Sequence, residues 1–353
     1  MKLKGVSLFS SAGIGETYLS NIGINIVVAN EIVQKRVDLY RHLYPETTMV
    51  AGDISKKDIF NTVLKESGED IDLLIATPPC QGVSIAGKNR NTKAMLSDER
   101  NFLIYKVIDF IKIKQPKYIL IENVPMFLKL QLPYKQQLHL VEEIIDKEFS
   151  KQYNIEIQIL DAADFETPQH RNRAIIKMYK KGLHWKWPNK KKHITVKETI
   201  GHLPSLESEE SSNIDWHFAR KHTKNHINWL KNTPTGKSAF QNKIHFPKKD
   251  NGDRIKGYLS CYRRINWDRP SPSITMRNDA ISSQRNVHPG RKMSSGYYSD
   301  ARVLTPLEIM LLSSLPKNWS IPKDTKEILI RQCIGECVPP KLTESLLKNI
   351  GKE

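Results

Sequence analysis

A cysteine at the end of a predicted strand is the residue of this sequence best placed to do chemistry. It lies in the stretch Thr77-Pro78-Pro79-Cys80-Gln81-Gly82, directly after the mainly apolar run 71–76. A short apolar run is typical of a buried parallel strand, and the prolines end it because neither donates a hydrogen bond to a sheet. Cys80 is therefore predicted at the carboxyl edge of an open α/β sheet, where such sheets bind ligands. A thiol there is placed to act as a nucleophile, although a lone cysteine is more often a packed core residue.

A glycine-containing turn, Ser10–Glu16, follows the first predicted strand, and the second predicted strand ends at Asn30-Glu31. Glycines let the backbone approach a ligand, and an acid at the end of the second strand can accept hydrogen bonds from ribose hydroxyls. Dehydrogenases share this pattern, but the third glycine of their dinucleotide fingerprint is missing here. The turn therefore favours an adenosine ligand without a pyrophosphate, such as S-adenosylmethionine.

These residues need a sheet that gathers the ends of several strands at one edge. Apolar runs that alternate with helical stretches indicate βαβ units and a mostly parallel sheet, so we expect the α/β fold class. Asp53, directly after the third strand, is either an acceptor for an adenine amino group or a turn residue. The predicted strands are 6–9, 24–29, 49–51, 71–76, 118–121, 153–160 and 174–176, and the predicted helices are one that ends at 22, then 33–43, 102–113, 306–315, 328–333 and 341–350.

Two arginines, Arg171 and Arg173, lie in the polar stretch between the last two of these strands. Residues i and i+2 of an extended segment point to the same side. The two side chains could grip a phosphate together, or orient a base and a carboxylate. A solvated strand edge is the alternative interpretation, and the residues alone do not separate the two.

The chain of 353 residues has a formal net charge of +17, which favours a polyanionic partner such as nucleic acid. Beyond about residue 180, basic and aromatic residues mix and apolar periodicity fades, as expected of a module that faces DNA. His217, His222 and His226 lack the cysteines or carboxylates that would complete a metal site, so we expect no metal. Four cysteines form no disulfide framework, and no apolar run is long enough to span a bilayer. We therefore expect a soluble, cytoplasmic protein with no membrane partner.

Taken in order, these stretches resemble the sequence blocks of the DNA (cytosine-5) methyltransferase family over essentially the whole chain. The resemblance implies a Rossmann-like, S-adenosylmethionine-dependent methyltransferase with a smaller, irregular target-recognition domain. It implies a catalytic and cofactor-binding domain at 1–180, a target-recognition domain at 181–300 and a C-terminal segment, 301–353, that returns to the catalytic domain. The stretches that carry it are Phe9 with Ala12-Gly13-Ile14-Gly15, Pro78-Pro79-Cys80-Gln81, Glu122-Asn123-Val124, Gln169–Arg173, Arg269–Thr275 and Gly335–Pro340.

The resemblance also implies roles for single residues. Cys80 would attack C6 of a flipped cytosine, Glu122 would protonate or hydrogen-bond N3, and Arg173 would hold the base's O2, with Arg171 supporting the loop. Burial should raise the pKa of Glu122 if it is to act as an acid near neutral pH. The implied cofactor positions are Phe9, Gly13, Ile14, Gly15, Glu31, Ile32, Asp53, Ile54, Pro79 and Leu103. The implied DNA-contacting positions are Gln81, Ser84, Lys88, Gln169, Arg269, Thr275 and Arg285.

Three departures from the family pattern concern the cofactor: the extra residues Ser10-Ser11, Ile32 in place of a frequent Trp, and Glu336 in place of an Asn. The implied function is methyl transfer from S-adenosylmethionine to C5 of a cytosine in a specific duplex DNA sequence. The family architecture indicates a monomeric bacterial or phage enzyme that is paired with a restriction endonuclease. A transfer RNA substrate and a catalytically silent DNA-binding protein are the alternatives, and the recognised sequence is not readable from the residues.

Overall fold

The computed structural model describes residues 2–79 and 98–352. The predicted nucleophile Cys80 and the predicted DNA contacts Gln81, Ser84 and Lys88 lie outside the described residues. Among the helices of the described part, none is both long and apolar enough to cross a membrane.

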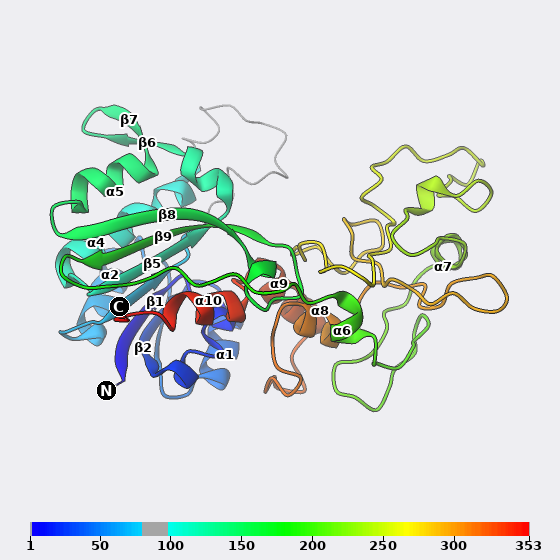
Figure 1. Ribbon diagram of the computed structural model, residues 1–353, viewed down its shortest axis with the longest axis horizontal. Coiled ribbons are helices and arrows are strands. Elements are labelled where there is room, and N and C mark those ends of the chain that lie inside the picture. Colours follow the sequence, from blue (N-terminus) through cyan, green and yellow to red (C-terminus); the bar gives the residue numbers. More distant parts are fainter. Residues whose placement is uncertain (1, 80–97, 353) are drawn as a thin grey trace. The chain divides into compact units, whose positions relative to one another are not determined.

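The chain forms two compact units (Figure 1). The first comprises residues 1–161, 172–189 and 343–353, and the second comprises residues 162–171 and 190–342. The units differ from the predicted domain boundaries, because residues 301–342 group with the second unit and the return to the first begins at Thr343. The division of labour between a catalytic and a target-recognition domain stays a prediction.

The first unit is built on a seven-stranded sheet with the order β3-β2-β1-β4-β5-β9-β8. The neighbouring strands β3, β2, β1, β4 and β5 pair in parallel. Strands β9 and β8 then add two antiparallel pairs. This arrangement confirms the predicted mostly parallel sheet. The strand order reverses beside β1, and ligands of open α/β sheets bind at such a switch point. The strands are β1 (Leu3–Leu8), β2 (Ile24–Glu31), β3 (Thr48–Ala51), β4 (Leu73–Ala76), β5 (Tyr118–Asn123), β8 (Tyr153–Asp161) and β9 (Asn172–Lys180).

A single apolar core covers one face of this sheet. Alternate residues of the strands enter it, such as Val6 and Leu8 of β1 and Ile119 and Ile121 of β5, because successive side chains of a strand point to opposite faces. Burial of each such side chain contributes roughly 1.5–3 kcal/mol. The helices that pack on this core are α2 (Lys57–Ser67), α4 (Ile104–Lys114) and α5 (Val141–Phe149).

On the opposite face of the sheet, the segment that follows β9 contacts both the strands and the last helix. Tyr118 of β5 meets the ring of Trp185 edge-on, with ring centroids 5.8 Å apart. The indole N–H of Trp185 donates to the carbonyl of Leu346 in α10 (Pro340–Leu347) at 2.8 Å. The buried ammonium of Lys177 lies 4.3 Å from the ring centre of Trp187, so this segment is fastened by a cation–π contact as well.

Local structure differs from the prediction near the start of the chain. The helix expected to end at Ile22 is two separate 3-10 turns, η1 (Ile14–Glu16) and η2 (Ser20–Ile22). Gly13 and Gly23 flank these turns in the left-handed conformation, with φ of 70° and 78°, which only glycine adopts without strain. The remaining elements of the first unit are α1 (Gln34–Leu43), η4 (Glu99–Leu103), η5 (Pro125–Lys129) and a hairpin of β6 (Gln131–Tyr134) and β7 (Gln137–Leu140).

In the described part of the first unit, the sequence prediction lacks the helices α2 and α5 and the β6–β7 hairpin. In α2 the buried residues are Phe60, Val63 and Ser67, at the three- and four-residue spacing of one helix face. This spacing matches the 3.6-residue helical period, so the local pattern already indicated a helix that the sequence prediction overlooked.

The second unit has little regular structure, as the fading periodicity beyond residue 180 indicates. Its small apolar core includes Trp229, Leu230, Val287 and Val303. Within its described residues the β-pairing consists of isolated bridges. Its helices are η6 (Ala162–Asp164), α6 (Val196–Ile200), α7 (Lys224–Lys231), η7 (Ala239–Gln241), α8 (Pro306–Leu312) and α9 (Glu327–Glu336).

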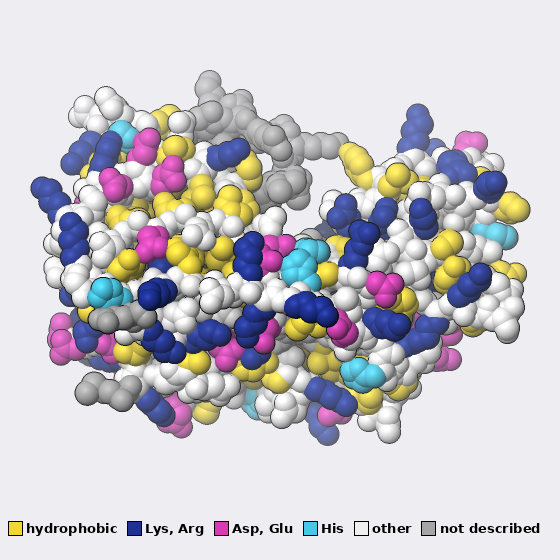
Figure 2. All heavy atoms as spheres, in the orientation of Figure 1, with side chains coloured by type: hydrophobic (Ala, Val, Ile, Leu, Met, Phe, Trp, Pro, Cys, Tyr) yellow, Lys and Arg dark blue, Asp and Glu magenta, His cyan; other side chains and the backbone are white. Residues whose placement is uncertain are grey.

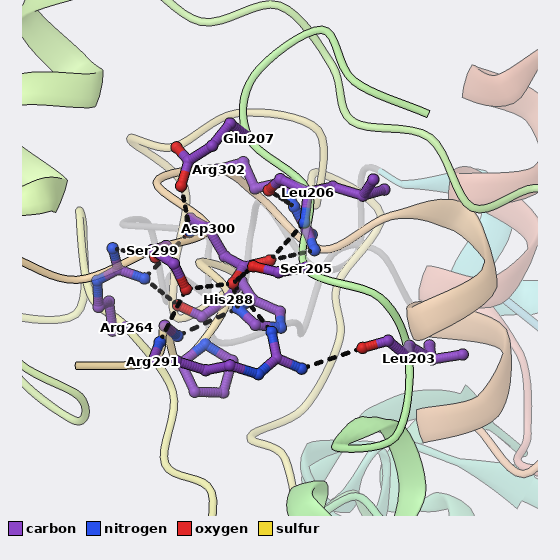
Figure 3. Close-up of polar contacts among 12 residues, drawn as sticks. Leu203, Ser205, Leu206, Glu207, Arg264, His288, Arg291, Ser299, Asp300 and Arg302 are labelled. Atoms are coloured by element: carbon purple, nitrogen blue, oxygen red, sulfur yellow. Dashed lines mark hydrogen bonds and ion pairs between the residues drawn. The ribbon is translucent and has the colours of Figure 1, made fainter. Parts of the chain in front are cut away.

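A buried ionic network ties the loops of the second unit together (Figure 3). The fully buried guanidinium of Arg302 donates to both carboxylate oxygens of Glu308, at 2.8 and 2.9 Å, and to Oδ1 of Asp300 at 2.9 Å. Arg264, also fully buried, donates to the backbone carbonyls of Leu230, His288, Ser299 and Asp300. Buried backbone carbonyls need hydrogen-bond donors. In this unit the two arginines provide donors that neighbouring strands provide in a sheet.

Candidate active site

The loop after β1 is strained. Phe9, Ser11 and Gly13 have positive φ angles of 61°, 50° and 70°. A non-glycine residue in this region costs roughly 1–2 kcal/mol, and such residues cluster at ligand-binding loops. A Cβ at Gly13 would lie 2.4–2.9 Å from ring atoms of Tyr44 and Tyr40, so only glycine fits at this position.

Glu31, at the end of β2, organises this loop. Its side chain is buried, and Oε2 accepts from the backbone N–H of Ser11 at 3.0 Å while Oε1 accepts from that of Val33 at 2.8 Å. A carboxylate has about four acceptor positions, so lone pairs remain for the ribose hydroxyls that the sequence predicted. Ser11, one of the two extra residues in this loop, is therefore held to the end of β2 by Glu31, the same residue that is predicted to bind the ribose.

The ends of β2 and β3 offer the surroundings that an adenosine needs. The amide of Asn30 donates to the carbonyls of Val50 and Gly52, at 2.9 and 3.1 Å, and holds the two strand ends together. Ile32 is 63% exposed next to Glu31, which leaves an apolar side chain free to contact a flat ring. Oδ1 of Asp53 accepts from the N–H of Ser55 at 2.9 Å, the turn role that was the alternative interpretation.

The predicted cofactor positions thus gather at the carboxyl edge of the sheet and fit S-adenosylmethionine. The glycine loop presents backbone groups, Glu31 presents a carboxylate and Ile32 an apolar surface. The side chains of Ile14 and Ile54 are buried and serve as packing beneath the loops. Phe9, Gly15, Pro79 and Leu103 are partly buried.

The described start of the Cys80 turn is fastened to the strands on both sides. Thr77 donates its N–H to the carbonyl of Leu8 at 3.2 Å and its hydroxyl to that of Phe9 at 2.9 Å. From the other side, the amide of Asn123 donates to the carbonyl of Pro78 at 2.8 Å. The turn that leads to the predicted nucleophile is therefore tied to the glycine loop and to the end of β5.

Glu122 and Arg173 form an ion pair that strands β5 and β9 bring together. Nε of Arg173 lies 2.5 Å from Oε1 of Glu122, and the two side chains are only 11% and 9% exposed. The pairing of Asn123 with Ala174 in the sheet places the two residues at the same strand ends. A buried carboxyl beside a guanidinium can donate to and accept from the polar edge of a base.

Two other predicted residues lie buried in the second unit. Arg171 donates to the carbonyls of Ile274 at 2.8 Å and Gly335 at 3.0 Å, contacts that suit the loop-supporting role implied for it. Gln169, expected at DNA, is 1% exposed and binds Ser313 and the N–H of Ile274. Both side chains therefore stabilise loops of the second unit, and the DNA contact of Gln169 stays a prediction.

The other predicted DNA contacts of the second unit face solvent. Arg269, Thr275 and Arg285 are exposed, and Arg285 has a strained φ of 48°. Lys and Arg side chains are dense over the second unit on the face drawn in Figure 2. The exposed basic residues near the 248–254 turn are Lys243, Lys248, Lys249, Arg254 and Lys256.

Sequence interpretation missed Glu16, Tyr44 and Asn123 as parts of the site. The hydroxyl of Tyr44 donates to the carbonyl of Gly13 at 2.6 Å, and Glu16 lies buried directly beneath the same loop. Tyr40 and Tyr44 are four residues apart, so their spacing was a signal that both reach the same loop. Glu16 gave a weaker signal, as an acid inside a turn whose neighbours are small or apolar.

A parallel sheet with a glycine loop after β1, an acid after β2 and polar groups after β4 and β5 defines a Rossmann-like methyltransferase. The match of residues 3–352 to the family model "C-5 cytosine-specific DNA methylase" shows that the chain belongs to this family. The chain is accordingly a DNA (cytosine-5) methyltransferase, as the resemblance implied.

Two relatives and two solved structures illustrate the similarity. The chain is 56% identical to the Type II methyltransferase M1.HgaI of Avibacterium volantium, over 99% of each chain. It is 28% identical to the Type II methyltransferase M1.HphI of Haemophilus parahaemolyticus, over 100% of this chain and 87% of the relative. The same fold is found in a prophage-encoded DNA modification methyltransferase of E. coli (TM-score 0.72, 20% identity, 99% and 98% covered). It is also found in Spodoptera frugiperda DNMT2 (TM-score 0.59, 18% identity, 98% and 99% covered).

Proposed function

We propose that this enzyme methylates C5 of one flipped cytosine in a specific duplex DNA sequence through a covalent bond between Cys80 and C6. Cytosine C5 is a poor nucleophile, and addition of a thiolate at C6 makes it enamine-like. S-adenosylmethionine, when bound, supplies the electrophilic methyl group. Loss of the C5 proton then lets the Cys80 thiolate leave by elimination. The Glu122–Arg173 pair, at the sheet edge where the Cys80 turn begins, is the observation that carries this proposal.

Glu122 and Arg173 would activate the base. Attack at C6 moves electron density toward N3, and a protonated Glu122 would donate to that atom. Arg173 would hold Glu122 in place and donate to O2 of the same base. Such charge-assisted hydrogen bonds are stronger than neutral ones, and they act best where water is excluded.

The second unit would recognise the target. Its exposed lysines and arginines suit phosphate contacts, and Arg269, Thr275 and Arg285 suit base edges or the backbone. A flipped base costs a few kcal/mol of stacking, which contacts in the pocket must offset. Gln81, Ser84 and Lys88 are proposed to contact the DNA.

A restriction nuclease is the proposed functional partner. The printed names of the two relatives place those proteins among the Type II methyltransferases. We infer that this enzyme acts as a monomer in a bacterial cytoplasm, or from a phage, and protects DNA from a nuclease of the same specificity.

Methylation of random-sequence duplex DNA followed by bisulfite sequencing tests the proposed reaction. We expect protected cytosines within one short motif, which would also identify the target. Uniform lack of protection would contradict the DNA specificity. An accompanying competition that offers transfer RNA and duplex DNA together distinguishes the RNA alternative, because only an RNA enzyme would transfer methyl groups to the transfer RNA.

Trapping with duplex DNA that carries 5-fluorocytosine tests the covalent step, since fluorine at C5 cannot leave as a proton. We expect the wild type to form a stable adduct and Cys80→Ala to form none while it still binds the cofactor. Cys261→Ala is the matched control, because Cys261 is a free cysteine of the second unit. An adduct that persists in Cys80→Ala would exclude Cys80 as the nucleophile.

A further inference from the structure

The loop that binds the cofactor rests on a buried carboxyl group. Glu16, in η1, is 7% exposed, and its Oε2 accepts from the hydroxyl of Tyr40 at 2.5 Å. The hydroxyl of Ser7, on β1, is its other hydrogen-bond partner. One turn further along α1, Tyr44 donates to the carbonyl of Gly13 at 2.6 Å, and the two tyrosine rings lie 4.8 Å apart. Two side chains next to each other therefore hold the loop, one through Gly13 and the other through Glu16.

The groups that face Glu16 do not include a cation. The contacts of its carboxyl are the hydroxyls of Ser7 and Tyr40. A cavity of about 210 Å³ opens beside it, and the other titratable groups in its lining are Tyr44 and Glu46. Across the described residues that line this cavity there is no Lys, Arg or His, so its lining offers no cation to pair with an ionised Glu16.

Burial makes the neutral form of this carboxyl accessible at ordinary pH. Desolvation raises the pKa of Glu16 from 4.5 to about 7, and the hydrogen bonds from Ser7 and Tyr40 lower it by less. Both protonation states of Glu16 are therefore populated near neutral pH, directly beneath the glycine loop.

We propose that Glu16 is a proton-dependent positioning residue: its neutral form holds the glycine loop in the conformation that binds S-adenosylmethionine, and its ionised form releases that loop. The inference rests on the proposed use of this cofactor. It assigns a role to a residue that touches neither the cofactor nor the reacting atoms.

The mechanism follows from where an ionised carboxyl can find solvent. The cavity beside Glu16 is lined by the hydroxyl-bearing residues Thr17 and Ser20 and is open to water. Rotation of a charged Glu16 toward it would break the bond to Tyr40 and pull on η1. Gly13 would move with it, since the N–H of Glu16 donates to the carbonyl of Gly13 at 2.9 Å. The backbone groups that cradle the cofactor would then lose their alignment.

Calorimetric titration with S-adenosylmethionine from about pH 6 to about pH 8.5 tests this inference. We expect binding to weaken by up to about tenfold per pH unit above 7, because the bound state then takes up one proton. Glu16→Gln, which keeps the hydrogen bonds but cannot ionise, should bind at about pH 8.5 as the wild type does at about pH 6. Titrations in two buffers of different ionisation enthalpy should show that the wild type takes up more protons on binding than this variant does, by up to about one proton.

The cofactor's own amino group titrates near pH 8 and changes the binding of every variant. The test therefore compares the pH dependence of binding between the wild type and Glu16→Gln. Glu46→Gln is the matched control, as the same change on an exposed residue of the same cavity, and should bind like the wild type. Equal pH profiles for wild type and Glu16→Gln would overturn the inference. Absence of binding by the wild type at about pH 6 would instead contradict the proposed cofactor.

Discussion

Single residues in the cofactor loop show where backbone strain is concentrated. Ser11 and Gly13 both adopt a left-handed conformation, but only glycine does so without a clash between Cβ and the backbone. The N–H of Ser11 is bound to Glu31, so the strained conformation is held by a hydrogen bond to a buried carboxylate. The serine at this position is therefore a stability cost that the loop tolerates.

We expect Ser11→Gly to raise the free energy of unfolding of the first unit by about 0.5–1 kcal/mol, since glycine relieves the left-handed strain. The hydrogen bond to Glu31 uses the backbone and is kept in this variant. Ser10→Gly is the control, because Ser10 lacks a positive φ and donates its hydroxyl to the carbonyl of Asn30 at 3.2 Å. Urea unfolding of the three proteins gives the comparison, and a destabilised Ser11→Gly variant would refute the strain argument.

Different interactions hold the secondary-structure elements of the two units in place. In the first unit, strand ends position the loops, and the pair Glu122–Arg173 meets because β5 and β9 are hydrogen-bonded neighbours. In the second unit, α8 is held by Glu308, whose buried carboxylate accepts two hydrogen bonds from the guanidinium of Arg302. The buried charges Asp300, Arg302 and Glu308 act there as the connections between loops and helix.

We expect Arg302→Met to destabilise the second unit by about 3–5 kcal/mol, because it leaves the buried carboxylate of Glu308 without its guanidinium partner and Asp300 with Arg291 alone. Arg220→Met is the matched control: Arg220 pairs with Glu327 at 3.4 Å in the same unit, but its side chain is 34% exposed. That exposed pair should contribute less than about 1 kcal/mol. Urea unfolding measures both variants, and equal losses would show that burial does not determine the strength of the network.

At the scale of the whole molecule, the two units should respond in opposite directions to acid. Burial beside Arg302 lowers the pKa of His288 to about 3, and burial beside His226 lowers that of His222 to about 4. These histidines stay neutral in the folded second unit while the unfolded chain takes up protons below about pH 6.5. The second unit therefore loses stability as the pH falls from about 6.5 through these values. In the first unit, the raised pKa of Glu16 adds stability at low pH that is lost as the pH rises through about 7.

Hydrogen exchange with mass-spectrometric readout can follow the two units separately. Between about pH 7 and about pH 5, after correction for the intrinsic exchange rate, we expect protection to fall in the second unit and to rise around Glu16. Glu16→Gln should abolish the rise in the first unit and leave the second unit unchanged. The same response in both units would contradict the assignment of these groups.

The sequence by itself determined the fold class, the ends of the central strands and the family. These depend on local patterns: apolar runs, glycines and prolines in turns, and acids directly after strands such as Glu31 and Glu122. Only the tertiary structure separated Arg171 from Arg173, buried Gln169, and revealed Glu16 beneath the glycine loop and Arg302 inside the second unit. Their partners lie far away along the chain, as Gly335 does for Arg171 and Glu122 does for Arg173. Burial and the protonation state of a side chain are set by such distant neighbours, because desolvation and hydrogen bonding depend on the folded surroundings and not on adjacent residues.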